Sequence, residues 1–117
     1  MMNRTRTQED GSTMEEQEFT RRAGQVFAQI EAVLEGVEKG LDYERASDGI
    51  LELDFDDGSQ MVIHRHAANR EIWVASKNGA FHFRWQGENW QDTRDGTLLW
   101  PRLGELVSMQ AGVSVCF

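Results

Sequence analysis

Carboxylates are the residues whose number and spacing point most directly to chemistry in this chain. Glu31, Glu35 and Glu38 fall at i, i+4 and i+7, which places them on one face of a helix. There they repel one another and lie near the negative end of that helix, each effect costing roughly a few tenths of a kcal/mol. Such a cost often marks a site that needs the charge, although drift on a stable helix produces the same pattern.

The acidic residues are concentrated between positions 31 and 57. Ten acids lie there: Glu31, Glu35, Glu38, Asp42, Glu44, Asp48, Glu52, Asp54, Asp56 and Asp57. Only Lys39 and Arg45 oppose them, so this segment carries a net charge of −8, equal to the formal charge of the whole chain. Because this field repels phosphate, nucleic acid is excluded as a partner, and cations or a protein with a basic patch are favoured.

Metal cations suit these carboxylates, because carboxylate oxygens are common ligands of divalent metals. Acids on one helix face, together with Asp42 and Glu44 on an adjoining strand, can share a cation with several waters. The sequence has no Glu-x-x-His pair, no two-His-one-carboxylate set and no cysteine cluster. We therefore expect weak binding, in which manganese, cobalt or calcium competes. A merely solubilising surface remains the alternative.

Two alternating stretches, 71–75 and 81–84, predict a pair of strands. Asn78 and Gly79 lie between them and predict a hairpin with these two residues at the centre of a type I′ turn. The alternation puts apolar side chains on one face and polar or aromatic ones on the other. The first face holds Ile72, Val74, Phe81 and Phe83, and the second holds Trp73, His82 and Arg84.

Trp73 is unusual on the polar face of a strand. Its large amphipathic ring is of the kind enriched at binding hot spots, and with Arg65 and Arg84 nearby it can anchor a partner. A loop that covers the ring is the alternative interpretation. His64 and His66 are two residues apart and point to the same side, so they can bind a divalent metal or be ordinary exposed histidines. His82 belongs to the same open face. Trp85, Trp90 and Trp100 are interpreted as packing residues.

Several functional classes find no support. Cys116 is the only cysteine, so it makes no internal disulfide and suits a reducing compartment, and no catalytic motif surrounds it. The chain has no G-x-S-x-G motif and no phosphate-binding loop. It also has no secretory signal and no apolar run near the roughly 20 residues that a spanning helix needs. We expect a cytoplasmic protein that is not an enzyme and has no catalytic residues.

The periodicity predicts one domain, residues 14–117, after a disordered tail of residues 1–13. A helix is expected from about Glu15 to near Gly40, and a second from about Thr97 to Gln110 whose regular part begins near Trp100 because of Pro101. Between them we expect strands at 42–44, 50–56, 60–65, 71–75, 81–84 and around 90. The fold class is α+β, a two-layer sandwich with both helices on one face of an antiparallel sheet of five to six strands. Val113–Phe117 is expected to fold back against a helix or the sheet edge.

The chain resembles the bacterial frataxin family, the CyaY proteins, over residues 14–117. The resemblance is carried by the leading acidic helix, by ILELDFDDGSQMVIHR and EIWVASKNGAFHF, by a turn bearing tryptophan and by LLWPRLGEL. It implies the same two-layer sandwich. It also implies weak iron binding, and docking on the cysteine desulfurase of the iron–sulfur scaffold complex, whose rate the family modulates.

Family positions match a metal site and a partner surface in this sequence. The acidic ridge corresponds to Glu31, Glu35, Glu38, Asp42 and Glu44, and the exposed sheet tryptophan to Trp73. Partner contacts are expected at Trp73, Arg65, His64, Glu71, His82 and Arg84. His64 stands where the family usually has Asn, and Glu71 where it usually has Gln. Ala32, Gly36, Val37 and Gly40 occupy positions that are often acidic or polar in the family.

The first hypothesis is an iron-binding regulator of iron–sulfur cluster assembly, a monomer without metal. The alternatives are a ferroxidase, for which the sequence offers no preorganised two-iron site, and an iron store that forms oligomers when iron bridges neighbouring ridges.

Overall fold

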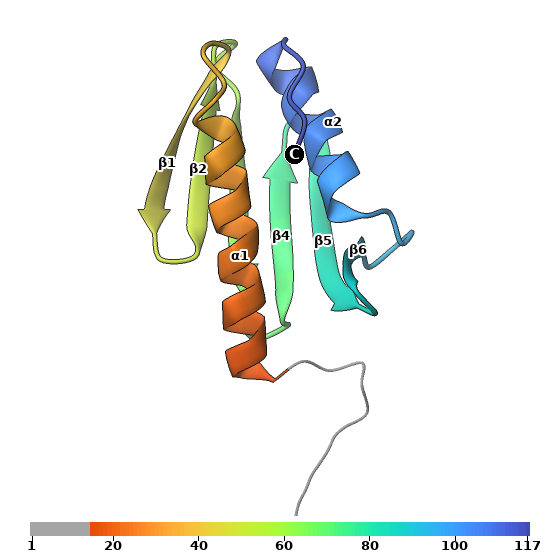
Figure 1. Cartoon of the computed structure of the whole chain (residues 1–117). Helices are drawn as coiled ribbons and strands as arrows, with labels where there is room; N and C mark the ends of the chain where they lie inside the picture. The colour runs from red at the N-terminus through yellow and green to blue at the C-terminus, as the bar shows by residue number, and fades with distance from the viewer. Residues whose placement is uncertain (1–14) are drawn as a thin grey trace, which may run out of the picture.

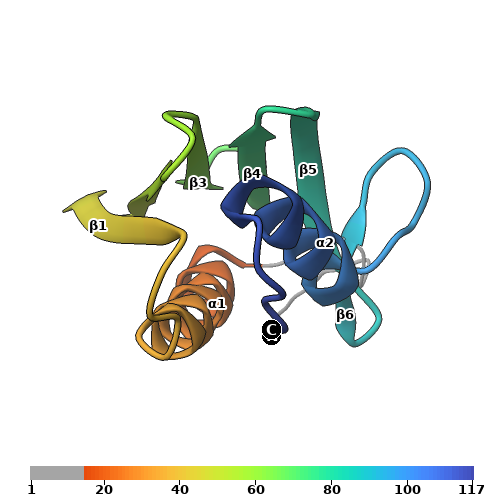
Figure 2. The same ribbon diagram turned by 90° about the horizontal axis from the view of Figure 1, so that it is seen from above.

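A six-stranded antiparallel sheet carries two helices on one of its faces in the computed structural model (Figures 1 and 2). The structure describes residues 15–117, and the tail expected at residues 1–13 lies outside this range. The elements are α1 (Glu16–Leu34), β1 (Leu41–Ser47), β2 (Ile50–Phe55), β3 (Gln60–His66), β4 (Glu71–Ser76), β5 (Gly79–Gln86), β6 (Asn89–Asp92) and α2 (Leu99–Ala111). The expected fold class is therefore confirmed.

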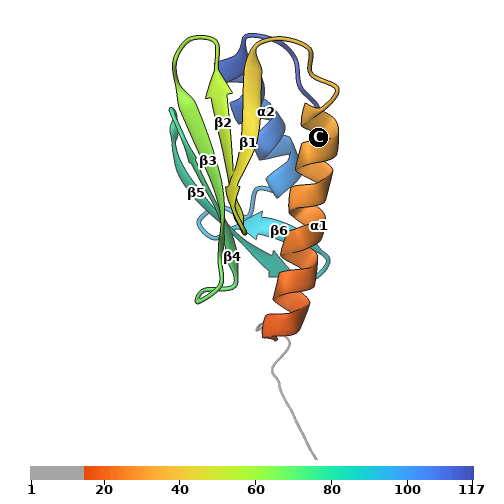
Figure 3. The same ribbon diagram turned by 90° about the vertical axis from the view of Figure 1, so that its left-hand side faces the viewer.

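The strands follow one another in sequence order as a meander, so β1 and β6 are the edges. Residues that face the helices form continuous rows across the sheet, such as Leu51, Ile63, Val74 and Phe81. The other face is not covered by a helix (Figure 2). Helix α1 runs beside the edge strand β1 (Figure 3), which brings the acidic end of the helix next to the acidic strand.

The core lies between the helices and the inner sheet face. Helix α1 contributes an apolar stripe of Phe19, Ala23, Val26, Phe27, Ile30 and Leu34, and α2 contributes Leu99, Leu103, Leu106 and Val107. Burying a side chain of this size stabilises the fold by about 1.5–3 kcal/mol relative to leaving it in water. The inner face is therefore fixed by packing, and the outer face is free to carry function. No helix within residues 15–117 has the length and apolar character needed to cross a membrane.

Helix α1 ends at Leu34, six residues before the expected end at Gly40. Leu34 is its last buried residue, and the next residues form tighter turns, with the N–H of Gly36 donating to the carbonyl of Val33 at 3.0 Å. Gly36 favours this ending because glycine is a poor helix former. The last turn of α1 also has no basic residue to offset the helix dipole. The helix is about 28 Å long at 1.5 Å per residue. Glu38 consequently lies beyond the helix.

The hairpin between β4 and β5 differs from the expected type I′ turn. Ser76 pairs with Gly79, so Lys77 and Asn78 are the loop residues, and Asn78 does not have a positive φ. The hydroxyl of Ser76 instead accepts from the N–H of Asn78 and donates to the carbonyl of Gly79. Side-chain hydrogen bonds thus hold this turn.

The C-terminal segment folds back against α2, as expected. Helix α2 begins at Leu99 and ends at Ala111, and its C-cap Gly112 has a left-handed φ of 72°. Val115 is buried, its N–H donates to the hydroxyl of Ser108 at 2.8 Å, and Phe117 stacks on Trp100.

Gln110 ties α2 to two hairpin turns. Its side-chain oxygen accepts from the N–H of Lys77, and its side-chain nitrogen donates to Ser59 and to the carbonyl of Gln60. The side chain is 6% exposed and therefore needs these partners.

Candidate functional site

The edge strand β1 separates the helix acids of the acidic ridge from the strand acids, which lie on the other face of the sheet. Tyr43 and Arg45 face the helices, and each holds one helix carboxylate: the hydroxyl of Tyr43 donates to Glu35 at 3.0 Å, and Arg45 donates to both oxygens of Glu31 at 2.7 and 3.4 Å. Desolvation and the bond to Glu35 raise the pKa of Tyr43 above its ordinary value. Two of the five expected ligands therefore already have partners within the chain.

The remaining strand acids, Asp42 and Glu44, point to the open face of the sheet. There they lie directly opposite Asp54 and Glu52 of β2. Like charges directly opposite each other on neighbouring strands are destabilising. Glu52 and Asp54 belong to the ten acids between positions 31 and 57 but are not among the five expected ligands. The pairing register of β1 and β2 was the missing signal.

Glu38 is exposed in the connection between α1 and β1. Within residues 15–117, no three His, Cys, Asp or Glu side chains lie together closely enough to hold one metal ion. Any cation at the acidic ridge would therefore be held by one or two carboxylates and by water. The ridge remains a prediction as a metal site.

A second group of functional side chains lies on the open face over β3, β4 and β5. His64, Trp73 and His82 form one row across these strands, and His66, Glu71 and Arg84 form the next row. This register confirms the open face that sequence alternation predicted for Trp73, His82 and Arg84. We call His64, His66, Trp73 and His82 the imidazole patch.

The aromatic rings of the imidazole patch are stacked. His66 lies 3.9 Å from Trp73, centroid to centroid, with an interplanar angle of 7°, and His82 lies at 4.2 Å and 11°. Since β3 and β5 flank β4 on opposite sides, the two imidazoles cover opposite faces of the indole. His64 meets Trp73 and His66 edge-on, with centroid distances of 6.2 and 5.8 Å. The interpretation that a loop covers Trp73 is therefore wrong: its neighbours on the sheet cover it.

The carboxylate of Glu71 holds Trp73 in the stack through hydrogen bonds to Trp73 and Arg84. One carboxylate oxygen accepts from Nε1 of Trp73 at 2.8 Å, and the other accepts from Nη2 of Arg84 at 2.6 Å. The side chain of Glu71 is only 5% exposed, whereas that of Arg84 is 45% exposed. Glu71 is thus a buried charge with two partners, as a buried carboxylate requires. Desolvation, with His66 and Arg65 adding to it, lowers the pKa of His64.

Arg65 does not belong to this surface. It pairs with Ile72, a core residue, so it points to the helix side of the sheet, and its guanidinium lies 3.2 Å from Asp48. The expectation that Arg65 stands beside Trp73 on the open face is wrong, because strand alternation separates it from its neighbours His64 and His66.

The other three tryptophans pack, as expected. Trp90 is buried against Phe19 and Trp85, and Arg22 lies 4.2 Å above the ring of Trp85. The ring of Trp100 stacks with that of Phe117.

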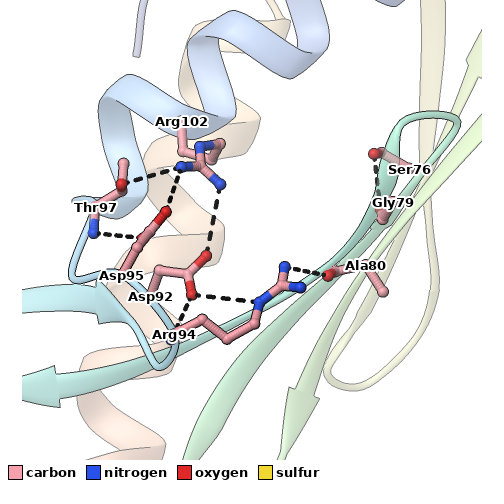
Figure 4. A network of polar contacts seen from close by, with 8 residues as sticks. All are labelled: Ser76, Gly79, Ala80, Asp92, Arg94, Asp95, Thr97 and Arg102. Carbon is pink, nitrogen blue, oxygen red and sulfur yellow. Dashed lines mark hydrogen bonds and ion pairs between the residues drawn. The ribbon is translucent and has the colours of Figure 1, made fainter.

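A separate charged network joins β6 to α2 (Figure 4). The buried carboxylate of Asp92 accepts from the N–H of Arg94 at 2.7 Å and lies 3.5 Å from Arg102, which also pairs with Asp95 at 3.2 Å. Arg94 reaches back to the carbonyl of Ala80. All of its members hold the loop before α2, so we assign this network to the fold.

Comparison with known proteins gives consistent matches along nearly the whole chain. The model of the frataxin-like domain matches residues 12–113. The iron-sulfur cluster assembly protein CyaY of Dechloromonas aromatica is 45% identical over 102 residues, covering 87% of this chain and 97% of the relative. The protein of the same name from Herminiimonas arsenicoxydans is 43% identical over 106 residues, covering 87% and 95%. Frataxin from Psychromonas ingrahamii superposes with a TM-score of 0.80 at 24% identity, covering 88% of this chain and 97% of that one.

Proposed function

Because the chain belongs to the frataxin-like family, we propose that it serves iron–sulfur cluster assembly by binding iron weakly at its acidic ridge and docking on the cysteine desulfurase. The relatives at 45% and 43% identity are named iron-sulfur cluster assembly proteins, and each is matched over at least 95% of its length. The proposal therefore concerns the whole domain and not a fragment of it.

The acidic ridge carries the iron half of the proposal. Carboxylate oxygens suit iron, and those of the ridge are open to solvent or weakly paired with Tyr43 and Arg45. A protein that hands iron on needs exchangeable ligands and no closed cage. A ferroxidase needs several ligands preorganised around its metal, and residues 15–117 hold no group of three. That observation favours the regulator over the enzyme.

Docking is proposed to use both surfaces together. The acidic ridge provides negative charge along the β1 edge, and the imidazole patch with Glu71 and Arg84 provides a rigid aromatic surface beside it. A desulfurase with a basic patch would meet the ridge first and the tryptophan platform second. Arg65, which faces the helices, is not included.

Charge reversal tests the proposal. The triple variant Glu31→Lys, Glu35→Lys and Glu38→Lys is expected to lose both iron binding and desulfurase binding while its unfolding transition remains cooperative. Amide NMR titrations with ferrous iron, without oxygen, and then with the desulfurase measure this. Wild-type signals between residues 31 and 44 should shift or broaden with iron, and those around Trp73 should follow with the enzyme.

A matched control separates the ridge from net charge. Glu16→Lys, Glu88→Lys and Glu105→Lys change the charge by the same amount at exposed positions away from the ridge. This control should bind as the wild type does. Equal losses in both triple variants, or full binding by the ridge variant, would contradict the proposal. Light scattering with and without iron then reports whether iron bridges ridges into oligomers.

A further inference from the structure

All three histidines of this 117-residue chain lie in one cluster around Trp73. Histidine is the side chain whose ordinary pKa places its charge change between pH 5 and 8. Besides the α-amino group and Cys116, which is exposed at the far end of the chain, no other group ordinarily titrates near that range. The response of this protein to physiological changes of pH is therefore concentrated on one surface.

This surface is rigid before any partner arrives. Both faces of the indole are covered by imidazoles and its N–H is bound to Glu71. Trp73 consequently cannot insert into a pocket of a partner as a protruding anchor. A partner must lie flat across the edges of the rings, and in doing so it removes water from the imidazoles.

We propose that the imidazole patch is a proton-sensitive docking surface, which a basic protein partner occupies only when the imidazoles are neutral. Docking then releases protons and weakens as the pH falls. The inference rests on the proposed function, since it concerns regulation of the same partner surface.

The chemistry of the patch supports this direction. Removing water from an imidazolium costs more than removing it from a neutral ring, so a partner that covers the patch favours the neutral form. Nδ1 of His66 is buried and has no hydrogen-bond partner among the described residues. A neutral ring can carry its proton on Nε2, whereas an imidazolium would place an unpaired N–H at that buried nitrogen.

Charged residues from several strands surround the histidines of the imidazole patch. Arg84 from β5 and Arg65 from β3 are positive, and Arg65 contributes to lowering the pKa of His64. Glu71 from β4 is neutralised by Arg84, and Asp48 from the β1–β2 turn is paired with Arg65. Glu52 and Asp54 of β2, with Asp42 and Glu44 of β1 opposite them, are the acids on the open face that remain to attract protons to the patch. A partner with a basic patch, which the acidic ridge favours, would engage those acids and add positive charge beside the rings.

Affinity measured against pH tests the inference. A histidine of ordinary pKa, about 6.5, that must be neutral lowers affinity about fourfold between pH 7.5 and pH 6.0, and His64, whose pKa is lowered, contributes less. The wild-type protein should therefore bind immobilised cysteine desulfurase at least about fourfold more weakly at pH 6.0. Calorimetry at pH 6.5 in phosphate and in Tris should show that complex formation releases protons.

Two variants separate titration from stacking. His64→Asn, His66→Gln and His82→Gln together remove every imidazole, whereas His66→Phe with His82→Phe keeps two flat rings against Trp73 without a titrating group. In either variant the ratio of affinities at the two pH values should be smaller than in the wild type, and under about twofold where no imidazole remains.

The outcomes are distinct. A wild-type affinity that is the same at both pH values, or a pH dependence that both variants keep in full, overturns the inference while leaving the proposed function intact. A wild-type protein that does not bind the desulfurase at any pH refutes the docking half of the proposed function, and this inference with it.

Discussion

The strand acids of the acidic ridge and the imidazole patch lie on the same face of one sheet, but their charges are arranged in opposite ways. The strand acids of the ridge face other acids across the strand pair, Asp42 against Asp54 and Glu44 against Glu52. The patch has its one carboxylate, Glu71, buried and doubly bonded beneath a stack of rings. One surface accumulates repulsion that a partner or cation can relieve, and the other is ordered in advance and contributes stability.

This difference assigns different tasks to the two surfaces. Exposed charges on the ridge act at long range and depend on salt, so they suit attraction of a cation or of a basic partner. A rigid aromatic platform loses little entropy on contact, so it suits the final orientation of the complex. The comparison predicts that substitutions on the two surfaces change stability in opposite directions.

The largest effect is expected at Glu71. Glu71→Ala leaves the indole N–H of the half-buried Trp73 without its acceptor and Arg84 without its partner, so the free energy of unfolding should fall by about 2 kcal/mol. Most of this is assigned to Trp73, because Arg84 is almost half exposed and water replaces much of its pairing. Glu71→Gln keeps an acceptor and should lose about half as much. Urea unfolding measures both, and Glu44→Ala, at an exposed position, is the control. Equal losses for Glu71→Ala and Glu44→Ala would remove the distinction between the two surfaces.

A smaller effect of opposite sign is expected at Glu52. Glu52→Gln removes one member of the like-charge pair with Glu44, so the protein should become more stable by about 0.5 kcal/mol at low salt. The gain should shrink in about 0.5 M salt, because screening already weakens the repulsion. Glu88→Gln, an exposed acid in the β5–β6 turn, serves as the control in the same unfolding series. If Glu52→Gln loses stability at low salt, the ridge does not store repulsion as described.

The smallest effect is expected at Arg45, whose guanidinium pairs with the carboxylate of Glu31 and so competes with a bound cation for it. Arg45→Gln should free that carboxylate and raise the affinity for a divalent cation about two- to threefold, since exposed ion pairs contribute up to about 1 kcal/mol. Titration with manganese, followed by the relaxation of water protons, gives the affinity. Arg21→Gln, on the exposed surface of α1, controls for the change in net charge. An unchanged affinity would show that Glu31 does not contribute to cation binding.

Sequence patterns predicted the strands and their faces because alternation and register are consequences of the same backbone geometry. Leu51, Leu53, Ile72 and Val74 had to point inward together, and Trp73 with His82 therefore had to point outward. The family resemblance led to the same sandwich. Arg65 lies on the other face of the sheet because alternation separates it from His64, its neighbour in sequence.

Two features of the site required coordinates. The end of α1 depended on where the apolar stripe loses its partners, and Leu34 is its last fully buried residue although Val37 continues the pattern as a half-buried residue. The stack of His66, Trp73 and His82 depended on side-chain rotamers, and His66 is diagonal to Trp73 on the neighbouring strand, a relation that alternation alone does not reveal. The burial of Glu71 likewise depends on the rotamers of Trp73 and Arg84, which bond its two carboxylate oxygens.

The side chain of Gln110 couples the local opening of the end of α2 to that of two hairpin turns. It joins α2 to the turn at Ser59 and Gln60 and to the turn at Lys77, two hairpin ends that the ion pair between Lys77 and Asp57 at 3.3 Å also links. Fraying the last turn of α2 breaks all of these bonds at once. The amide hydrogen of Lys77, which donates to Gln110, should therefore exchange with solvent at the rate set by the end of α2 and not by its own hairpin. Motions at the C-terminal end of α2 are in this way transmitted to the β2–β3 and β4–β5 turns that Gln110 contacts.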